Sequence, residues 1–479
     1  MNTHAKPIPQ AGAVKFALVL AGTVFLLMMI VGLLMRATQG ALIDLDPALF
    51  YQFMTVHGAG MVGTAALSGA CIMWYFLGRH VALNRAVFWI FLALFLLGVV
   101  LILVAVLIGG FGGGWTFLYP LPALSGGAWE PWAAASFVLG YTFIGVGFLL
   151  FYLEAGRAMI KAYGGLARAM GWHVAFGGAD VDTAPPPAVV ASAVVTVFNT
   201  LGIVVGAAVL VATLVNLLVP GFDVDALLAK NMIFFFGHVF INASIYMAVI
   251  AVYEIIPDYT GRPWKTSRIF ALSWATILLF VMAVYPHHLL QDMVMPGWML
   301  VMGQIVSYLS GIPLLAVTAF SLLVYLRGSG IRWDLASALL VLGVAGWSAG
   351  TVPAIIDGMI SVNKVMHNTL WVPGHFHTYL ILGEVAMAFG FMAWLVKRGK
   401  SEAGLTGLDR AAFSIYTAGG VGFVLMFMIS GAMSVPRRWA VHFEDWIFQD
   451  QVATGFGVLV LLGATLIVLR YLGGVLGSK

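Results

Sequence analysis

The 479-residue chain contains very little charge and almost no cysteine. Charged residues make up 9% of it, whereas hydrophobic residues make up 62%. That imbalance excludes an ordinary soluble protein and is typical of a chain that crosses a membrane many times. The single cysteine, Cys71, excludes a disulfide framework, a CxxCH haem-attachment motif and a cysteine-ligated copper or iron–sulfur site. The small net charge of +4 gives no indication of nucleic-acid binding.

Long apolar segments, each sufficient for one membrane-spanning helix, recur through the whole chain. The twelve segments lie at residues 14–36, 52–79, 87–110, 131–155, 189–218, 230–256, 266–290, 296–326, 333–359, 370–397, 411–434 and 450–476. We therefore predict an all-α membrane protein, with one twelve-helix domain over residues 1–479. The N-terminal stretch is polar and no convincing cleavage site follows it, so we expect the first helix to be retained.

Lys and Arg are distributed unequally between alternate loops of this arrangement. One side receives 18 of them and the other receives 5. Because basic loops stay in the cytoplasm, we expect both termini on the cytoplasmic side of a prokaryotic cell (inner) membrane. This orientation places seven of the eleven histidines in one outer layer, at the starts or ends of helices or in an outer loop: His57, His238, His287, His288, His367, His375 and His377.

Two histidines separated by one residue begin the tenth segment, in Trp371-Val-Pro-Gly-His375-Phe-His377. On an α-helix, residues two apart point about 200° from each other, to nearly opposite faces. Imidazole is also the commonest metal ligand among side chains. We therefore predict that this helix stands between two haems, or between a haem and another site.

A second group of histidines is expected at the same depth. His287 and His288 follow Pro286, and adjacent residues of a regular helix would diverge by about 100°. Both can reach one metal only where the helix bends, and Pro286 supplies such a place. His238 would complete a three-histidine metal site with an open position for a small molecule. Each histidine taken alone fits an interfacial side chain better, but a pair with a matching third favours the metal.

His57 is the remaining ligand candidate, in His57-Gly58-Ala59-Gly60-Met61. Its glycines would let a flat macrocycle approach the helix, although a helix-packing face explains them equally well. If His377 is the second axial ligand, the two histidines can hold a six-coordinate low-spin haem. His375 would then hold a five-coordinate haem that faces the three-histidine metal.

These residues together resemble the catalytic subunit of the haem–copper oxidase superfamily, and the wording Val-Pro-Gly-His-Phe-His resembles its B-type branch most. The matching motifs follow the family's order: His57-Gly58-Ala59-Gly60-Met61, Gly114-Trp115-Thr116, Gly237-His238, Pro286-His287-His288, His367-Asn368 with Gly374-His375-Phe376-His377, and Pro436-Arg437-Arg438. By this resemblance His57 and His377 ligate the low-spin haem, expected to be haem b. His375 would be proximal to a high-spin haem of type b or a.

The resemblance also implies the second metal and the residues around the haem propionates. The three-histidine site would bind copper (CuB), with iron as the less favoured metal. His367 and the pair Arg437-Arg438 would contact the propionates through charge-assisted hydrogen bonds. This arginine pair is the only basic pair on the outer side, and an anionic-lipid or subunit contact is the alternative explanation for it.

One position departs from the oxygen-reducing members of the family. The A and B branches carry a tyrosine four residues after the first copper histidine, where this chain has Asn242. The C branch places its tyrosine six residues before the histidine pair, where this chain has Val281. An amide cannot be oxidised, though it can hydrogen-bond a bound ligand or water. This resembles the nitric oxide reductases of the superfamily, so we expect reduction of nitric oxide to nitrous oxide. Reduction of dioxygen to water by a B-type cytochrome c or quinol oxidase is the alternative.

Other polar residues are candidates for the proton chemistry. Tyr246 and Tyr285 lie near the metal histidines in the sequence but match neither tyrosine position. Glu254, Tyr253 and Ser307 are expected in the inner half. An intramembrane carboxylate is a functional suspect, but Glu254 is so near the interface that solvation explains it equally well.

The sequence contains no soluble electron-acceptor domain. We therefore expect a second subunit that carries a copper centre or a c-type haem, with cytochrome c or a cupredoxin as donor, or a quinol that docks directly. The surrounding partner is the lipid membrane, with no nucleic acid. A haem-binding membrane sensor or carrier is the remaining alternative, and the three-histidine site argues against it because a carrier needs no second metal.

Overall fold

A computed structural model describes residues 11–219, 221–397 and 404–477. The polar N-terminal stretch 1–10 lies outside this part of the chain. Four residues of the loop-charge count also lie outside it: Lys6, Arg398, Lys400 and Lys479. The described residues form helices joined by loops, without a β-strand.

Within the described residues, twelve helical spans are long and apolar enough to cross a membrane, which confirms the predicted all-α, twelve-helix class. They are α1 (Ala11–Gln39), α2 (Pro47–Leu77), α3 with η1 (Arg85–Ile108), α4 (Pro131–Tyr163), α7 (Pro187–Leu218), α8 (Ala226–Thr260), α9 with η3 (Arg268–Leu289), α10 to α12 with η4 (Gly297–Leu326), α13 (Leu335–Asp357), α15, η5 and α16 (Trp371–Lys397), α17 (Gly407–Ala432) and α18 (Glu444–Leu476). The short helices between them are α5 (Leu166–Ala169), α6 (Trp172–Ala175), η2 (Val181–Thr183) and α14 (Ile360–Met366).

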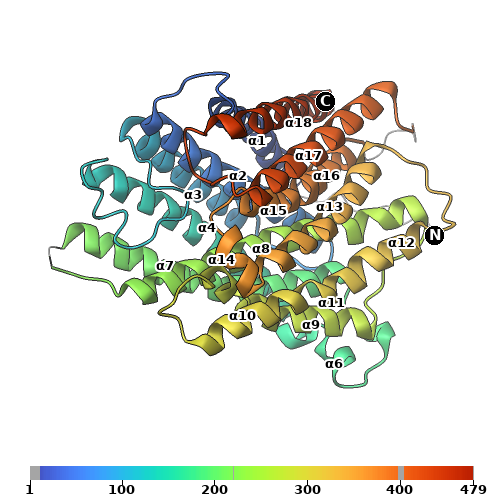
Figure 1. Cartoon of the computed structure of the whole chain (residues 1–479). Coiled ribbons are helices and arrows are strands. Elements are labelled where there is room, and N and C mark those ends of the chain that lie inside the picture. The colour runs from blue at the N-terminus through green and yellow to red at the C-terminus, as the bar shows by residue number, and fades with distance from the viewer. Residues whose placement is uncertain (1–10, 220, 398–403, 478–479) are drawn as a thin grey trace.

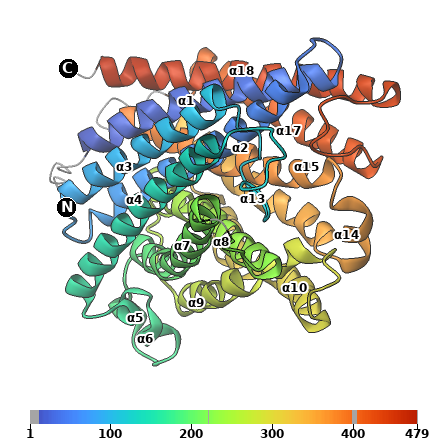
Figure 2. The same ribbon diagram turned by 90° about the vertical axis from the view of Figure 1, so that its left-hand side faces the viewer.

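The long helices run side by side in one bundle (Figures 1 and 2). The pairs α1 with α2, α3 with α4, α7 with α8 and α17 with α18 pack along each other, and α18 returns to pack beside α1. Three spans are enclosed by the others: 89% of the most apolar stretch of α2 is buried, 78% of that of α8 and 83% of that of α15 to α16, against at most 56% elsewhere. These three spans carry His57, His238, His375 and His377, so the candidate ligands lie in the enclosed centre.

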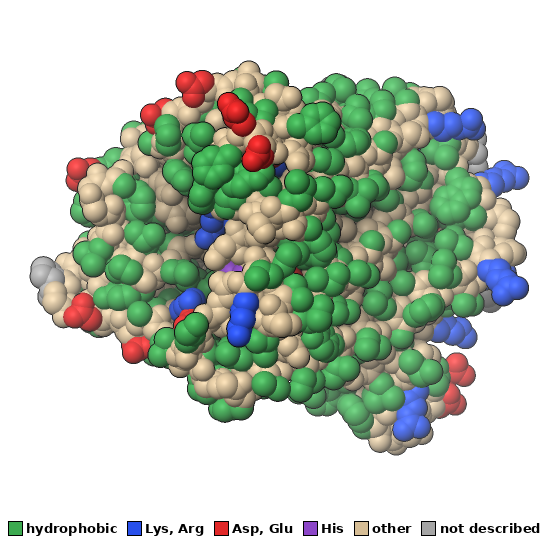
Figure 3. Space-filling model, in the orientation of Figure 1, with side chains coloured by type: hydrophobic (Ala, Val, Ile, Leu, Met, Phe, Trp, Pro, Cys, Tyr) green, Lys and Arg blue, Asp and Glu red, His purple; other side chains and the backbone are tan. Residues whose placement is uncertain are grey.

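Charge is segregated along the axis of the bundle (Figure 3). Lys and Arg gather at one end, most Asp and Glu at the other, and hydrophobic side chains cover the surface between them. Lipid imposes this pattern because apolar side chains face the hydrocarbon and charged ones stay at the interfaces. We refer below to the basic end, which includes Lys397 and Arg470, and to the opposite acidic end. Which end faces the cytoplasm stays a prediction from the loop charges.

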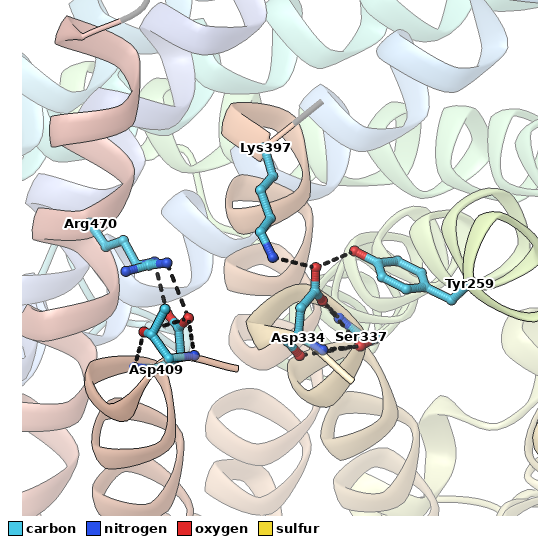
Figure 4. Close-up of polar contacts among 7 residues, drawn as sticks. Tyr259, Asp334, Ser337, Lys397, Asp409 and Arg470 are labelled. Atoms are coloured by element: carbon cyan, nitrogen blue, oxygen red, sulfur yellow. Dashed lines mark hydrogen bonds and ion pairs between the residues drawn. The ribbon is translucent and has the colours of Figure 1, made fainter. Parts of the chain in front are cut away.

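Two ion-pair clusters tie the helices together at the basic end (Figure 4). Asp334, the N-cap of α13, accepts hydrogen bonds from Lys397 of α16 at 3.1 Å and from Tyr259 of α8 at 2.8 Å. Asp409 near the start of α17 pairs with Arg470 of α18 at 2.8 Å. These contacts hold the helices in register far from the histidines.

Two of the central helices begin earlier than predicted. Asp46 caps α2 and accepts two backbone N–H groups of the first turn, whereas Asp225 caps α8 and accepts one, from Leu228. The predicted starts were residues 52 and 230. His57 and His238 therefore lie about three turns inside their helices rather than at the first residues.

Candidate metal centre

Three histidines meet where α8 faces η3. The candidate ligand nitrogens of His238, His287 and His288 all lie within 4.8 Å of one another. The segment η3 is a 3₁₀-helix that continues α9 through Pro286, and its tighter turn replaces the regular helix there. The rings of His287 and His288 have centroids 4.2 Å apart with planes at 87°. The local departure from regular helix expected at Pro286 is therefore present, and it turns two neighbouring histidines toward one space.

Hydrogen bonds set the proton position on His287. The hydroxyl of Ser307 lies 2.6 Å from His287 Nδ1 and 2.8 Å from the carbonyl oxygen of Gly303. Serine has one O–H, and because it donates to Gly303, Ser307 must accept a hydrogen bond from His287 Nδ1–H. His287 Nε2 then carries the lone pair, and it is buried without a hydrogen-bond partner in the described chain. Ser307, expected on a proton path, instead lies behind a candidate metal ligand.

The other two histidines also present nitrogens at a suitable spacing. His238 Nδ1 lies 3.1 Å from His288 Nε2. Two nitrogens that each bind one tetrahedral ion at ~2 Å would lie about 3.3 Å apart, so this pair fits a shared ion. Three imidazoles with an open fourth position match the donor set of a metal site that binds a small molecule.

Asn242 touches the opposite nitrogen of His238. Its Nδ2 lies 2.9 Å from His238 Nε2 and 2.9 Å from the carbonyl oxygen of the same residue. The two amide hydrogens can serve these two acceptors. A metal bound at His238 Nδ1 would instead require Nε2–H, and the amide would then turn its oxygen to accept that hydrogen. Asn242 is thus positioned to hold the orientation of His238.

His57 and His377 face each other across a separate space. Both Nδ1 atoms lie 2.7 Å from backbone carbonyl oxygens, that of Met28 for His57 and that of Pro373 for His377. Because a carbonyl only accepts, both Nδ1 atoms carry hydrogens and both Nε2 atoms have free lone pairs. The ring centroids are 6.4 Å apart and the planes differ by 19°. Two metal–nitrogen bonds of ~2 Å plus about 1 Å from each nitrogen to its ring centre predict a similar separation, so the pair fits two axial ligands of one iron.

A cavity of about 340 Å³ includes both of these rings. Its volume lies in the range of small-ligand and cofactor sites. Gly32 makes room for the ligand candidate itself, because a Cβ there would lie 2.6 Å from His57 Cε1. Gly58 lines the cavity, as expected of a residue that admits a macrocycle, but its missing Cβ also makes room for Trp115, whose Cδ1 would lie 2.3 Å away.

His375 lies on the other side of the same helix turn from this cavity. Its Nδ1 is buried and has no hydrogen-bond partner among the described residues. It interacts electrostatically with His238, His287 and His288, whereas His377 interacts with His57. Within the helix α15 (Trp371–His377), the two histidines therefore neighbour different histidine groups, and their assignment to two cofactor sites stays a prediction.

Two loops are joined at the acidic end beside these sites. Thr369 and Pro436 form an isolated antiparallel bridge, and Arg437 N donates to Asn368 O at 2.9 Å. This pairing brings the arginine pair from the loop after α17 to the loop that contains His367.

The charges in these loops suit an anion. Burial, followed by the adjacent Arg438 charge, lowers the pKa of Arg437 to about 10, so its guanidinium stays charged at neutral pH. Its Nε is buried without a partner in the described chain. Burial and the two arginines lower the pKa of His367 to about 4, so His367 is neutral and can still donate one hydrogen bond. Both arginines line the 340 Å³ cavity.

A buried ionic cluster next to the cavity was missed by the sequence analysis. Arg36 of α1 forms an ion pair with Asp450 of α18, and their side chains are 2% and 0% exposed. Asp450 also lies 2.5 Å from His442 Nδ1. The Arg36 guanidinium lies 4.6 Å above the ring of Phe427, which stacks on His377 at 5.2 Å. Arg36 was counted only as a loop charge because nothing local links it to a residue 414 positions away.

Neither tyrosine candidate forms a hydrogen bond with the three histidines in the described part of the chain. The Tyr285 hydroxyl donates to Asn231 Oδ1 at 3.1 Å. Tyr246 is buried between Trp274 and Trp347, with ring centroids 5.7 and 6.3 Å away.

The inner-half candidates divide between the helix end and the core. Glu254 pairs with Arg79 at 3.2 Å and with His80 at 3.3 Å. It is sixteen residues beyond His238, which is about 24 Å along a helix, so the structure does not bring it to the histidines. The Tyr253 hydroxyl lies 2.7 Å from Thr318 Oγ1 inside the bundle.

Comparison with known proteins identifies the family. The family described as "Cytochrome C and Quinol oxidase polypeptide I" matches residues 12–466. The chain belongs to this family. It is the family of haem–copper oxidase subunit I, whose members are multi-pass membrane oxidoreductases that hold haems and CuB in complexes with other subunits, and the three-histidine cluster agrees with the CuB requirement.

Individual relatives are distant. Cytochrome c oxidase subunit 1 of Thermus thermophilus is 26% identical over 279 residues, 53% of this chain and 49% of that protein. The heme-copper oxidase subunit I+III of Aeropyrum pernix is 26% identical over 237 residues, 48% of this chain and 28% of that protein. Subunit 1 of Synechocystis is 25% identical over 455 residues, 88% of this chain and 75% of that protein. The first two matches thus span half or less of the relatives' length.

One solved structure has the same fold. A heme-copper terminal oxidase dimer determined by cryo-electron microscopy superposes with a TM-score of 0.76, covering 98% of this chain and 85% of that chain at 20% identity. Similarity at this identity shows the fold alone, and it agrees with the twelve-helix bundle.

Proposed function

We propose that this chain is the catalytic subunit of a membrane enzyme that reduces nitric oxide to nitrous oxide. The observation that carries the proposal is Asn242, one helical turn after His238, where oxygen-reducing A- and B-type relatives place a tyrosine. The C-type position is Val281. Cleavage of dioxygen uses an electron and a proton from that tyrosine. Coupling of two nitric oxide molecules takes two electrons and two protons. Haem iron and the second metal would supply the two electrons without an oxidisable side chain, and the two protons would come from solvent.

The proposed ligands follow from the way the histidine nitrogens are grouped. His57 and His377 would hold the low-spin haem, for which b is the proposed type, and His375 would hold the high-spin haem. His238, His287 and His288 would hold the second metal, for which copper is preferred over iron. The Nδ1–H groups of His57, His377 and His287 donate to oxygens behind each ring, which orients every Nε2 before a metal binds. This preorganisation supports a built site over interfacial histidines.

The protein's remaining task is to hold anions and to exclude water. Arg437 and Arg438 offer charged donors to the propionates at the acidic end, and neutral His367 offers a further donor. Asn242 would hold the orientation of His238. Electrons would enter through a second subunit with a copper or c-haem site, supplied by cytochrome c or a cupredoxin, or from a quinol. The membrane would be the prokaryotic inner membrane with both termini in the cytoplasm.

An anaerobic assay tests the substrate. The purified complex, reduced by an artificial donor, receives nitric oxide, and nitrous oxide is measured by gas chromatography. We expect one nitrous oxide for two nitric oxide consumed, and none from a His287→Ala variant that lacks one metal ligand. Sustained four-electron reduction of dioxygen without nitric oxide turnover would overturn the proposal.

Dioxygen reduction is the second candidate. It is favoured by the names of the relatives, several of which are cytochrome c oxidase subunits. Metal analysis and the optical spectrum of the reduced, CO-bound protein settle two further points, copper against iron and haem b against haem a.

A further inference from the structure

Glu384 is a carboxylic side chain enclosed in the membrane-spanning core. It lies in the π-helical segment η5 (Thr378–Val385) and is 1% exposed. This segment packs against α2, α8, α13 and α17. Within the described chain no Lys, Arg or His forms an ion pair with it, and its Oε1 is buried without a partner. An isolated ionised carboxylate is very costly in such surroundings, so Glu384 is expected to carry a proton.

The hydrogen bond between the Glu384 side chain and Ser244 leads to the same conclusion. Ser244 Oγ lies 2.8 Å from the carbonyl oxygen of Ile241 and 3.2 Å from Glu384 Oε2. Serine has one hydrogen, and the shorter contact, to an oxygen that can only accept, takes it. Ser244 is then the acceptor toward Glu384, and the hydrogen of that second bond must come from the carboxyl group.

In the described part of the chain, the tyrosines that pack around η5 provide no positive charge. Tyr416 of α17 donates its hydroxyl to the carbonyl oxygen of Ile381 at 2.7 Å. Tyr246 of α8 and Tyr379 of η5 interact with each other. Phenols are neutral at physiological pH, so none of these groups stabilises an ionised carboxylate by charge.

Glu384 lies between the histidine layer and the basic end. It is seven residues beyond His377, and Ser244 is six beyond His238. A rise of ~1.5 Å per residue puts both about 10 Å further along their helices, on the side toward the basic end. Short π-helical segments within α-helices are frequent at functional sites. A buried acid at this depth can therefore exchange protons with the histidine layer from the side that faces the basic end.

We propose that Glu384 is a proton-relay residue, which gives its proton to the reaction at the histidine layer and regains one from the basic end. The proposal rests on the proposed function, because reduction of nitric oxide or dioxygen consumes protons. The carboxyl O–H bond breaks, the proton is taken up by the oxygen that leaves as water, and a solvent proton restores the bond. Ser244 stabilises the transient carboxylate by turning its hydrogen from Ile241 to Oε2. No electron passes through Glu384.

Time-resolved infrared difference spectroscopy on the whole complex tests the relay. During one turnover, the band of a protonated carboxyl group should disappear and return in the wild type. It should be absent in Glu384→Gln, and it should shift in Ser244→Ala, which removes the hydrogen-bond partner. Glu130→Gln, a change of an exposed carboxylate in an outer loop, should leave the band unchanged.

Kinetics separate a relay from a structural role. Glu384→Gln should slow turnover by about tenfold to a hundredfold while the rate of low-spin haem reduction stays unchanged. Glu384→Asp, which keeps the acid, should restore part of the turnover with a shifted band, and it also serves if the glutamine variant does not fold. A band that persists in Glu384→Gln, or full turnover without the band, would overturn the relay. Failure of the wild type to reduce nitric oxide would overturn only the proposed substrate, because the carboxyl band can be followed with dioxygen.

Discussion

Asn242 Nδ2 lies 2.9 Å from Nε2 of His238, one turn away on the same helix. The contact joins Asn242, the residue on which the proposed function rests, to the histidine that α8 contributes to the three-histidine cluster. It gives the amide a physical role, which is to set the proton position and orientation of an imidazole.

Replacing Asn242 by leucine tests that role. The change leaves His238 Nε2 without its partner, so we expect metal content and nitric oxide turnover to fall by about tenfold to a hundredfold. Mass spectrometry of the metals and anaerobic nitrous oxide formation measure the two effects. Asn231→Leu, on the same helix but hydrogen-bonded to Tyr285, is the matched control. Wild-type metal content and turnover in Asn242→Leu would show that the amide is dispensable.

Replacing Ser307 by alanine removes the acceptor of His287 Nδ1–H. The proton of His287 is then free to shift to Nε2, so we expect the affinity for the second metal to fall by about tenfold to a hundredfold. Metal retention during dialysis against a chelator measures it. Ser310→Ala changes a serine on the same helix whose hydroxyl donates to the Ser307 carbonyl oxygen at 3.3 Å, and it should retain the metal. Equal retention in both variants would contradict the assigned hydrogen bond.

Alanine variants of the haem ligand candidates should affect the two haems differently. His57→Ala and His377→Ala each remove one axial ligand from the cavity, so the low-spin bands should be lost. His375→Ala should instead remove CO binding by the high-spin haem. The haem-to-protein ratio and reduced-plus-CO spectra measure these losses, with His80→Ala at the basic end as control. Loss of CO binding in His57→Ala while the low-spin bands persist would reverse the assignment.

Replacing Arg437 by glutamine removes a cation beside the cavity. A nearby positive charge favours the reduced haem, so we expect the low-spin midpoint potential to fall by on the order of 50 mV. The Arg437 guanidinium is charged at neutral pH, so the full effect should be present at pH 7. Spectroelectrochemical titration measures the midpoint potential. An unchanged potential in Arg437→Gln would place the propionates elsewhere.

Replacing Asp450 by asparagine leaves Arg36 buried without its charge partner. The free energy of unfolding should fall by about 3–5 kcal/mol, and the melting temperature should fall with it. The low-spin spectrum should shift as well, because Arg36 lies above Phe427, which stacks on His377. Asp409→Asn is the comparison: its partner Arg470 is 37% exposed, so a smaller loss is expected. Equal losses in the two variants would show that burial of Arg36 adds nothing.

Features that depend on local sequence could be predicted from it. The twelve spans follow from the length of each apolar run, and the two directions of His375 and His377 follow from the helical repeat. The departure from regular helix at Pro286 follows from the missing N–H of proline. The depth of each histidine could be predicted from its distance to the nearest loop. The prediction was least accurate for His57 and His238, because α2 and α8 begin earlier than expected.

Only the tertiary structure decided which atoms meet across helices. The carbonyl of Met28 behind His57, Ser307 behind His287 and the pair Arg36–Asp450 join different helices. So does the contact of Glu384 with Ser244, although an acidic residue within an apolar run was itself a signal that the sequence analysis passed over. Such contacts depend on how each helix is rotated about its axis and on which neighbour it packs against. Hydrophobic length specifies neither, because lipid accepts every rotation of an apolar helix until its packing with other helices selects one.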